Sequence, residues 1–415
     1  MSPERDEAIW KVSSPSRWQT PPARMSVSTL LELEACPRRW ALSNSEYSHI
    51  WTGKGYPRPL HLAATEGTVV HRALQVLTSA LVASGATLVT GDSVVRVLRK
   101  LGGYTSVIRD CIAEALSVYA GSPRARRRVD DAQRQLASRL PDLRCRVQQL
   151  LSRIALWSPS VDVGTKRGTP DGLRRCRCGH GSFAELRLQA TGIHWYGVVD
   201  LLTVSPDCCE IRDFKTGKPK PDHEFQLQVY ALLWAMDGEA NPAGRLADRL
   251  VISYEGGDID VPAPDRERLS NLERELVART DTVLRNLAVS PPVGRPQEAR
   301  CQYCEVRHLC DDFWRHHRNC PHVESAGLPQ FGDIQLRISD RHGPASWDGV
   351  VESSTAAASG QDVLLRTVDL PFELRPGYRV RLLNVCLSAL GGELDDGVHP
   401  VTIATMGSST EMFSL

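Results

Sequence analysis

Two aspartates and one lysine in the middle of the chain have the spacing of a metal-assisted hydrolytic site. Asp213 and Lys215 are two residues apart in a predicted strand, so their side chains share one face. Asp200 lies in the preceding predicted strand, and a meander would bring the two carboxylates side by side. Adjacent carboxylates repel each other unless a divalent cation neutralises them, which suits Mg²⁺ or Mn²⁺. A lysine beside that cation can orient or deprotonate an attacking water and stabilise charge on a phosphate.

Other polar residues stand at fixed places around this set. His71 lies one turn inside a predicted helix that starts near Glu66, and Gln226 and Tyr230 lie four residues apart on one face of another. Glu185 lies in the first strand of the meander, where alternation places it on the face opposite its apolar neighbours. Each residue alone has a structural explanation, such as a core histidine, a surface salt bridge or a solvated helix edge. Their order and spacing together indicate a catalytic site.

Four of the twelve cysteines form a second candidate site. Cys301, Cys304 and Cys310 are close together in the sequence, and Cys36 precedes them by about 265 residues. In a reducing compartment, clustered thiols indicate metal or iron–sulfur ligation rather than disulfides. Four thiolates are what a [4Fe–4S] cluster needs.

Zinc is the alternative ligand for the close cysteines. The three thiols at 301–310 also fit a local zinc site that takes Cys320 or His317 as its fourth ligand. A separate group, Cys176, Cys178 and His180, also has metal-like ligands, but its Cys-x-Cys spacing is tighter than is usual for zinc. Its role stays open.

The candidate residues depend on a predicted core of helices and short strands. The first 160 residues are mostly helical, after a Pro/Ser/Arg-rich mobile tail at 1–24. After residue 160 the pattern predicts a meander of three strands, a helix, a strand and a long charged helix, at 183–190, 193–204, 208–215, 222–236, 250–254 and 265–288. The fold class is therefore α/β.

Residues 325–415 form a separate, all-β block. Five short predicted strands separated by Gly, Pro and Asp turns occupy 332–339, 347–353, 361–368, 378–387 and 399–405. The block loosely resembles an OB fold, a fold that binds single strands with a basic groove and stacking aromatic rings. The candidate nucleic-acid contacts in this block are Trp347, Tyr378, Arg379 and Arg381.

Local basic clusters offer a further path for nucleic acid. Arg38 and Arg39 lie beside Cys36, and Arg126 and Arg127 belong to an arginine-rich run. Such side chains neutralise phosphates without reading sequence. An arginine run is more often only a solvated face.

The composition excludes several classes of protein. The 415 residues include 50 Lys+Arg and 49 Asp+Glu, so no bulk basic charge indicates nucleic acid. No apolar run approaches the ~20 residues that a bilayer span needs, and the N-terminus lacks the apolar region of a secretory leader. We expect a soluble, cytoplasmic protein of several domains that makes no contact with a membrane.

The combined motifs resemble those of the PD-(D/E)XK nucleases. Within that superfamily they are similar to the RecB-like exonucleases, including the CRISPR-associated RecB-like enzymes that carry an iron–sulfur cluster. The resemblance covers about residues 26–315 and rests on the helix histidine and three short motifs: His71, Gly-Val-Val-Asp200, Asp213-Phe-Lys215 and Gln226-x-x-x-Tyr230.

The resemblance implies a fold. It is a restriction-endonuclease-like core, in which a mixed sheet is flanked by helices. One nuclease domain would cover 25–320, with a helical insertion at about 85–160 and the cysteine cluster at 301–310, followed by the OB-like domain at 325–415.

The resemblance also implies roles for individual residues. His71, Asp200, Asp213 and the backbone carbonyl of Phe214 would bind the Mg²⁺ or Mn²⁺ ion. Lys215 would assist the nucleophilic water. The remaining site residues would hold the scissile strand, position the lysine or support a second ion: Gln226, Tyr230 and Glu185. Cys36, Cys301, Cys304 and Cys310 would hold a structural [4Fe–4S] cluster.

We therefore expect a metal-dependent DNA nuclease, an exonuclease that acts on single-stranded or free-ended DNA in repair, recombination or defence. The chain has no Walker-type Gly-x4-Gly-Lys-Ser/Thr string, so a helicase or another subunit would supply any unwinding. Two alternatives stay open. One is a non-catalytic DNA-binding subunit of a larger complex, and the other is a zinc-stapled RNA nuclease.

Overall fold

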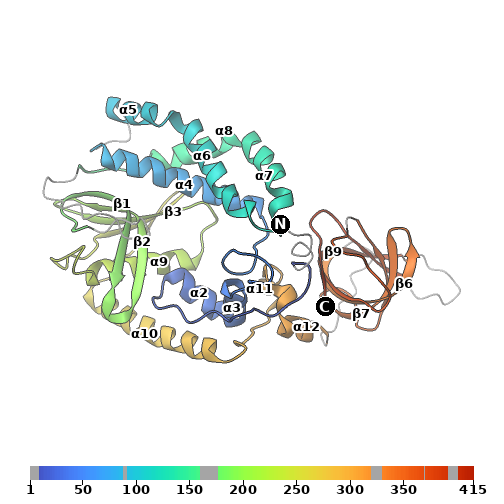
Figure 1. The fold of residues 1–415 in the computed structure, drawn as a ribbon. Coiled ribbons are helices and arrows are strands. Elements are labelled where there is room, and N and C mark those ends of the chain that lie inside the picture. The colour runs from blue at the N-terminus through green and yellow to red at the C-terminus, as the bar shows by residue number, and fades with distance from the viewer. Residues whose placement is uncertain (1–8, 87–90, 159–175, 319–329, 369, 391–400) are drawn as a thin grey trace.

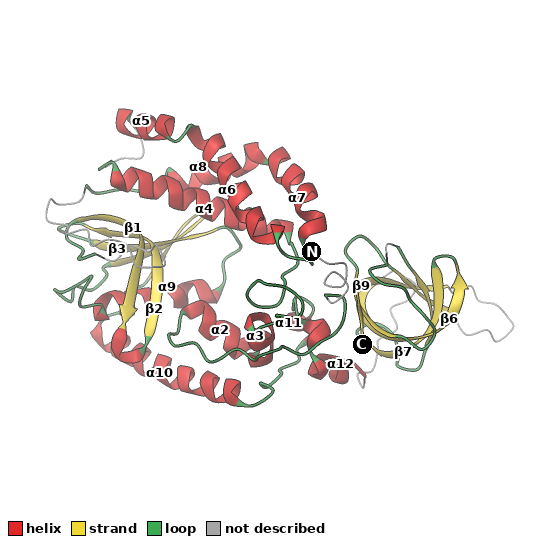
Figure 2. Ribbon diagram, viewed as in Figure 1, coloured by secondary structure: helices red, strands yellow, loops and turns green. Residues whose placement is uncertain are grey.

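Figures 1 and 2 show a computed structural model of the chain, which has two parts. The structure describes residues 9–86, 91–158, 176–318, 330–368, 370–390 and 401–415. One part holds a five-stranded sheet between layers of helices, and the other holds a six-stranded sheet. No helix in these ranges is both long and apolar enough to cross a bilayer.

The first sheet is mixed, as the sequence predicts. Its strands follow the order β1 (Gly181–Ala190), β2 (Trp195–Val204), β3 (Cys209–Lys215), β4 (Arg249–Tyr254) and β5 (Gly257–Val261). Only β3 and β4 run parallel. Parallel neighbours need a crossover connection, and helix α9 (Pro221–Met236) provides it. The predicted meander, helix and strand are confirmed, whereas β5 was not predicted.

Helices cover both faces of this sheet (Figure 1). One face packs on α2 (Val27–Ala35), α3 (Pro37–Asn44), α9 and α10 (Arg266–Ala288). The other packs on α4 (Leu62–Ala83), α5 (Asp92–Lys100), α6 (Gly103–Ala120), α7 (Arg126–Ser138) and α8 (Leu140–Leu151). Each face of the sheet packs on its own apolar core. A polar side chain on the sheet is therefore shielded from water and needs a hydrogen-bond or ion-pair partner within the protein. The α/β class with a restriction-endonuclease-like arrangement is confirmed.

The C-terminal part is a β-barrel. Its strands are β6 (Gln330–Gly343), β7 (Ser346–Ser354), β8 (Asp362–Arg366), β9 (Arg379–Leu390), β10 (Val401–Thr405) and β11 (Glu411–Ser414). They pair in the order β10-β8-β7-β6-β9-β11, and β10 also pairs with β9. This second pairing closes β6–β10 into a ring around a core that includes Leu336, Leu365 and Leu382. The predicted C-terminal all-β block is therefore confirmed.

The short elements between the two parts dock the barrel. They are α11 (Glu298–Cys301), the 3₁₀ turn η2 (Arg307–Leu309) and α12 (Asp311–Arg318). Arg307 forms a buried ion pair with Asp333 of β6 and also donates to Asn384. Arg124 pairs with Glu411 of β11 at 2.6 Å. These arginines therefore join the helical part to the barrel through charged hydrogen bonds that are shielded from water.

The segment that precedes α2 also contacts the barrel. The sequence predicts a mobile tail at 1–24, but the described residues from Ile9 onward make specific contacts. Ile9 is buried, and Val12 donates a backbone hydrogen bond to Ser414 of β11 at 2.7 Å. Trp10 lies against the ring of Phe413, with 5.6 Å between the ring centroids. The two ends of the described chain therefore meet at one edge of the barrel.

The buried Arg307–Asp333 pair generates a first prediction. Replacing one partner of a buried ion pair leaves an uncompensated charge, which costs about 3–5 kcal/mol. Asp333→Ala should therefore lower the free energy of unfolding of the barrel by about that amount, measured by urea denaturation. Asp348→Ala is the matched control, because the Asp348 side chain is half exposed and pairs with His342. Exposed pairs of this kind contribute about 0–1 kcal/mol. Equal losses in the two variants would contradict the role of the pair.

Candidate active site and cysteine cavity

Three carboxylates lie in one row across the first sheet. One step beyond the Leu201–Arg212 pair, the antiparallel register of β2 and β3 places Asp200 opposite Asp213. On the other side of β2, the register with β1 places Glu185 opposite Asp200. Like charges directly opposite each other destabilise a sheet. The row therefore needs neighbouring cations.

The backbone of β1 is distorted at Glu185. This residue has a left-handed φ of 53°, which is uncommon for a residue with a side chain. Ala184 packs in the core on the α4 side, whereas Leu186 and Leu188 pack in the core on the α9 side. The alternation expected from the sequence is therefore wrong at this point, because the strand changes faces at Glu185. Such distortions are common beside functional sites.

Two groups hold the carboxylate of Asp200, which is buried. Its Oδ2 accepts a hydrogen bond from the backbone N–H of Phe214 at 2.7 Å. It also lies 3.3 Å from Nε2 of His71, which α4 carries to this edge of the row. The Asp200 charge raises the pKa of His71 to about 9. In the absence of a metal, the histidine is therefore an imidazolium paired with Asp200 at neutral pH.

Lys215 joins the carboxylates to helix α9. Its ammonium lies 2.6 Å from Oδ2 of Asp213 and donates to Oε1 of Gln226 at 2.8 Å. Gln226 in turn donates to the hydroxyl of Tyr230 at 2.5 Å, one helical turn further along α9. The predicted Gln226–Tyr230 face is therefore turned toward the lysine, and it fixes where the ammonium lies.

Burial makes two carboxyl groups weak acids here. Asp213 is 2% exposed, and its burial, with the neighbouring Asp200 charge, raises its pKa to about 7. Burial also raises the pKa of Glu185 to about 7. Oδ2 of Asp213 is close to the lysine but not aligned with a hydrogen-bond donor among the described residues. The site thus offers a buried carboxylate oxygen that a bound cation could satisfy.

A glycine allows the close packing that this arrangement needs. A Cβ on Gly197 of β2 would lie 2.7 Å from the Tyr230 ring, which is too close for any larger residue. The tyrosine can therefore lie directly over β2 and hold Gln226 against Lys215. The close approach of the Tyr230 ring thus explains why the Gly-Val-Val-Asp200 motif begins with glycine.

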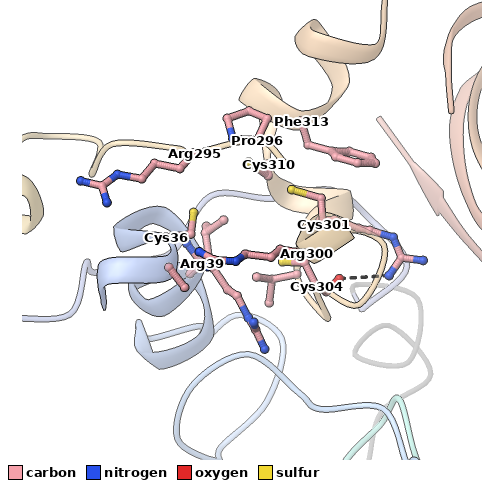
Figure 3. A pocket seen from close by; sticks show the side chains of 13 residues that line it. Cys36, Arg39, Arg295, Pro296, Arg300, Cys301, Cys304, Cys310 and Phe313 are labelled. Carbon is pink, nitrogen blue, oxygen red and sulfur yellow. Dashed lines mark hydrogen bonds between the residues drawn. The ribbon is translucent and has the colours of Figure 1, made fainter. Parts of the chain in front are cut away.

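The four candidate cysteines line one cavity (Figure 3). Cys36 comes from the junction of α2 and α3, whereas Cys301, Cys304 and Cys310 come from the α11–α12 region. All four are free thiols. The structure therefore brings together residues that are about 265 positions apart, as the sequence predicts. Across the described residues, no three His, Cys, Asp or Glu side chains are gathered closely enough to hold a single metal ion.

Two of the four sulfurs accept a backbone hydrogen bond. The N–H of Arg39 donates to Cys36, and the N–H of Gln297 donates to Cys301, at 3.4 and 3.3 Å. Burial raises the pKa of the other two thiols, Cys304 and Cys310. The cavity wall also includes Arg39, Arg295, Arg300 and Arg307. This cationic, N–H-rich lining suits sulfur ligands that carry negative charge. Of these arginines the sequence predicted only Arg39, because nothing in the spacing marks the others.

The predicted basic contacts outside the barrel have mixed outcomes. Arg38 donates to the carbonyl of Pro292 and pairs with Asp312, so it links α3 to α12. Arg126 begins α7, and the side chain of Arg127 lies outside the described residues.

Two of the four predicted barrel contacts are buried. Arg381 is 5% exposed and donates to Gln335, to the carbonyl of His308 and to Asp311. Trp347 belongs to the barrel core. These two predictions are wrong, because docking and core packing take both side chains away from solvent. Tyr378 is exposed, and Arg379 is half exposed and paired with Glu352.

The other described candidates for metal ligation, Cys176, Cys178, His180 and His317, are not among the residues that line the cavity. Cys176 and Cys178 pack against the core on the α9 side, and His180 is exposed. Cys320 lies outside the described residues, whereas His317 is buried with its ring edge-on to Phe313.

Comparisons with known proteins give one family. No curated protein matches this chain. A solved structure titled "Crystal structure of SSO0001" matches at 18% identity with a TM-score of 0.21, over 32% of this chain and 61% of that chain. The chain therefore spans about three fifths of the length of that protein. The family described as the PD-(D/E)XK nuclease superfamily matches residues 24–311, which is more than half of the chain. This protein belongs to the PD-(D/E)XK nuclease superfamily.

Proposed function

We propose that the protein is a metal-dependent deoxyribonuclease of the RecB-like branch. It would hydrolyse phosphodiester bonds as an exonuclease on single-stranded or free-ended DNA, in repair, recombination or defence. The observation that carries this proposal is the contact of Lys215 with Asp213 in a row that also contains Asp200. A half-buried ammonium next to paired carboxylates is an arrangement suited to phosphoryl chemistry.

The row offers the types of ligand that Mg²⁺ or Mn²⁺ prefers, and its described side chains would have to close around the ion to hold it. Asp200 and Asp213 offer the hard oxygen ligands that these ions prefer, and one of the oxygens has no aligned donor. His71 and the carbonyl of Phe214 would complete the protein ligands, and Glu185 would support them or hold a second ion. When bound, such an ion supplies an activated water and neutralises charge on the phosphate.

Lys215 would act on the water and the phosphate. Its ammonium is held between Gln226 and Asp213, so it can donate a hydrogen bond to an attacking water or to a phosphate oxygen. Tyr230 would fix Gln226 and thereby the direction of the lysine. In this proposal the lysine and the two aspartates are the catalytic residues, and Gln226 and Tyr230 are positioning residues.

Removal of the lysine tests the proposed chemistry. Lys215→Ala should reduce cleavage of end-labelled single-stranded DNA by about 10²–10⁴-fold, because the proton-transfer and charge-stabilising group is lost. Asp213→Asn should reduce it at least as much. Lys100→Ala, on the exposed face of α5, is the matched control and should cleave like the wild type. If the wild type binds DNA without cutting it in either metal, the non-catalytic DNA-binding subunit becomes the better assignment. Preference for matched RNA would support the RNA nuclease.

The raised pKa values predict that metal binding depends on pH. Around pH 6, His71, Asp213 and Glu185 carry protons that an incoming ion must displace. Affinity for Mn²⁺ should therefore rise between about pH 6 and pH 9, and binding should release protons. Isothermal titration calorimetry in two buffers with different ionisation enthalpies counts those protons. His71→Gln should release fewer of them, and pH-independent affinity in the wild type would contradict the assignment of these ligands.

We also propose that the cysteine cavity holds a [4Fe–4S] cluster. A [4Fe–4S] cluster takes four thiolates, and the four cysteines line one cavity. Backbone N–H groups directed at the sulfurs and nearby cations stabilise a cluster that carries negative charge. Zinc is the alternative for the close cysteines. In either form the group would be structural.

Metal analysis of one cysteine variant decides between these forms. Anaerobically purified protein should contain about four iron atoms per chain, and Cys36→Ser should lose most of the iron. Cys145→Ser, on the exposed surface of α8, is the control and should keep it. A colourless wild-type protein that contains zinc, and that keeps this zinc in Cys36→Ser, would support the local zinc site.

The fold of the barrel is our reason for proposing a single-stranded substrate. Five of its strands close in the order β6-β7-β8-β10-β9, with β8 and β10 parallel, which resembles an OB fold. Folds of this kind bind single strands. Tyr378 and Arg379 remain candidates for such contacts, and a helicase or another subunit would provide the single strand.

A further inference from the structure

A groove lies where the barrel meets the helical part. Its lining includes His61 before α4, the loop around Tyr303 and the start of β6 at Phe331. Tyr303 and Phe331 are each 73% exposed, more than any other aromatic side chain in the described ranges. Exposed apolar groups that share one groove, rather than being scattered singly, are typical of a binding surface. Because one ring comes from each part of the protein, the groove depends on the docked barrel.

Neutral polar groups surround the two rings. Gln302, Gln330, Thr355, Asn384 and Ser409 line the groove. Amides and hydroxyls can both donate and accept hydrogen bonds, which matches the mixed donors and acceptors on the edges of nucleobases. Rings flanked by such groups form a surface on which flat, polar-edged ligands can stack.

The charges of the groove do not favour phosphates. Arg124 and Arg307 lie in its wall but are paired with Glu411 and Asp333. Arg128 also lines the groove, where it donates to the backbone carbonyl of Ser408. Glu305 adds negative charge and lies 3.7 Å from the ring of His61. A nucleic acid held here would therefore be held mainly by its bases, with its backbone directed toward solvent.

We propose that this groove is a subsite for the unpaired bases of a single nucleic-acid strand, which stack on Tyr303 and Phe331. This inference rests on the proposed nuclease function and extends it to a place where the strand is held away from the carboxylates. Helix α4 links the two places. His61 lines the groove directly before α4, and His71 lies ten residues further on, about 15 Å along the helix axis. A strand of a few nucleotides spans that distance.

Binding can be measured without catalysis. The probe is a fluorescein-labelled dT20 strand, titrated with Lys215→Ala protein in Mg²⁺ and followed by fluorescence anisotropy. Stacking of one base on an aromatic ring contributes about 1–3 kcal/mol, or roughly 5- to 150-fold in affinity. Adding Tyr303→Ala and Phe331→Ala should therefore weaken binding by at least about tenfold. The dependence on salt should stay the same, because no phosphate contact is removed.

Three controls make the result specific. Tyr303→Phe with Phe331→Tyr should retain wild-type affinity, because both rings remain. Trp157→Ala removes an exposed aromatic residue outside the groove and should change nothing. An abasic strand of the same length should bind weakly, and the alanine pair should not weaken it further. All the groove substitutions are at exposed positions, where the cost to folding is small.

Unchanged affinity in the alanine pair would overturn the subsite. The same unchanged affinity is expected if the groove binds a partner protein instead of a nucleic-acid strand, so that case also overturns the subsite. A reduced salt dependence would overturn it as well, because the rings would then act through phosphate contacts. The nuclease proposal fails separately, through absence of cutting by protein with an intact Lys215, whatever the anisotropy shows.

Discussion

The crowding of three carboxylates in a buried sheet is the constraint on which the rest of the nuclease part depends. Asp200, Asp213 and Glu185 occupy one row, and burial raises the pKa of Asp213 and of Glu185. Cationic groups must therefore lie beside the row and be held there by the helices. His71 arrives from α4 and Lys215 is held by α9, so the helices on the two faces of the sheet are both required. The helices on the two faces of the sheet thus place the cationic groups that offset the repulsion between its carboxylates.

The free energy that this row costs is also the reason for the metal chemistry that we propose for it. A carboxyl group with a pKa near 7 is reluctant to ionise unless a cation is present. In the proposed function such a site would favour a divalent ion over water, because the ion would remove the repulsion between the carboxylates. Strain at Glu185, which has φ of 53°, adds to the same cost. Both penalties lie within a few residues of the proposed chemistry, whereas the apolar cores on the two faces provide the stability that offsets them.

Sequence patterns predicted the parts of the site that depend on local geometry. The period of two in a strand places Asp213 with Lys215, and the period of a helix places Gln226 with Tyr230; the structure shows both. A left-handed backbone at Glu185 has no sequence signal in a residue with a side chain, so the switch of faces there could not be predicted. Arg381 was chosen because arginines bind phosphates, but its surroundings are decided by docking against His308, a residue 73 positions away. Arg307 was missed for the same reason, since its partner Asp333 belongs to the barrel.

The segment from Cys304 to Trp314 lies between the cysteine cavity and the barrel, and it contacts both. It carries two of the cavity cysteines and, between them, Arg307 and the buried ring of His308, which stacks on Phe413 of β11 at 3.9 Å. Desolvation and the surrounding arginines lower the pKa of His308, so the ring is neutral and packs as an aromatic group. A group bound by all four thiols would fix this segment to Cys36 at the start of α3, and the segment in turn fixes the barrel. The shape of the groove beside Tyr303 would then depend on the cysteine cavity, because Tyr303 lies between Cys301 and Cys304 in the chain.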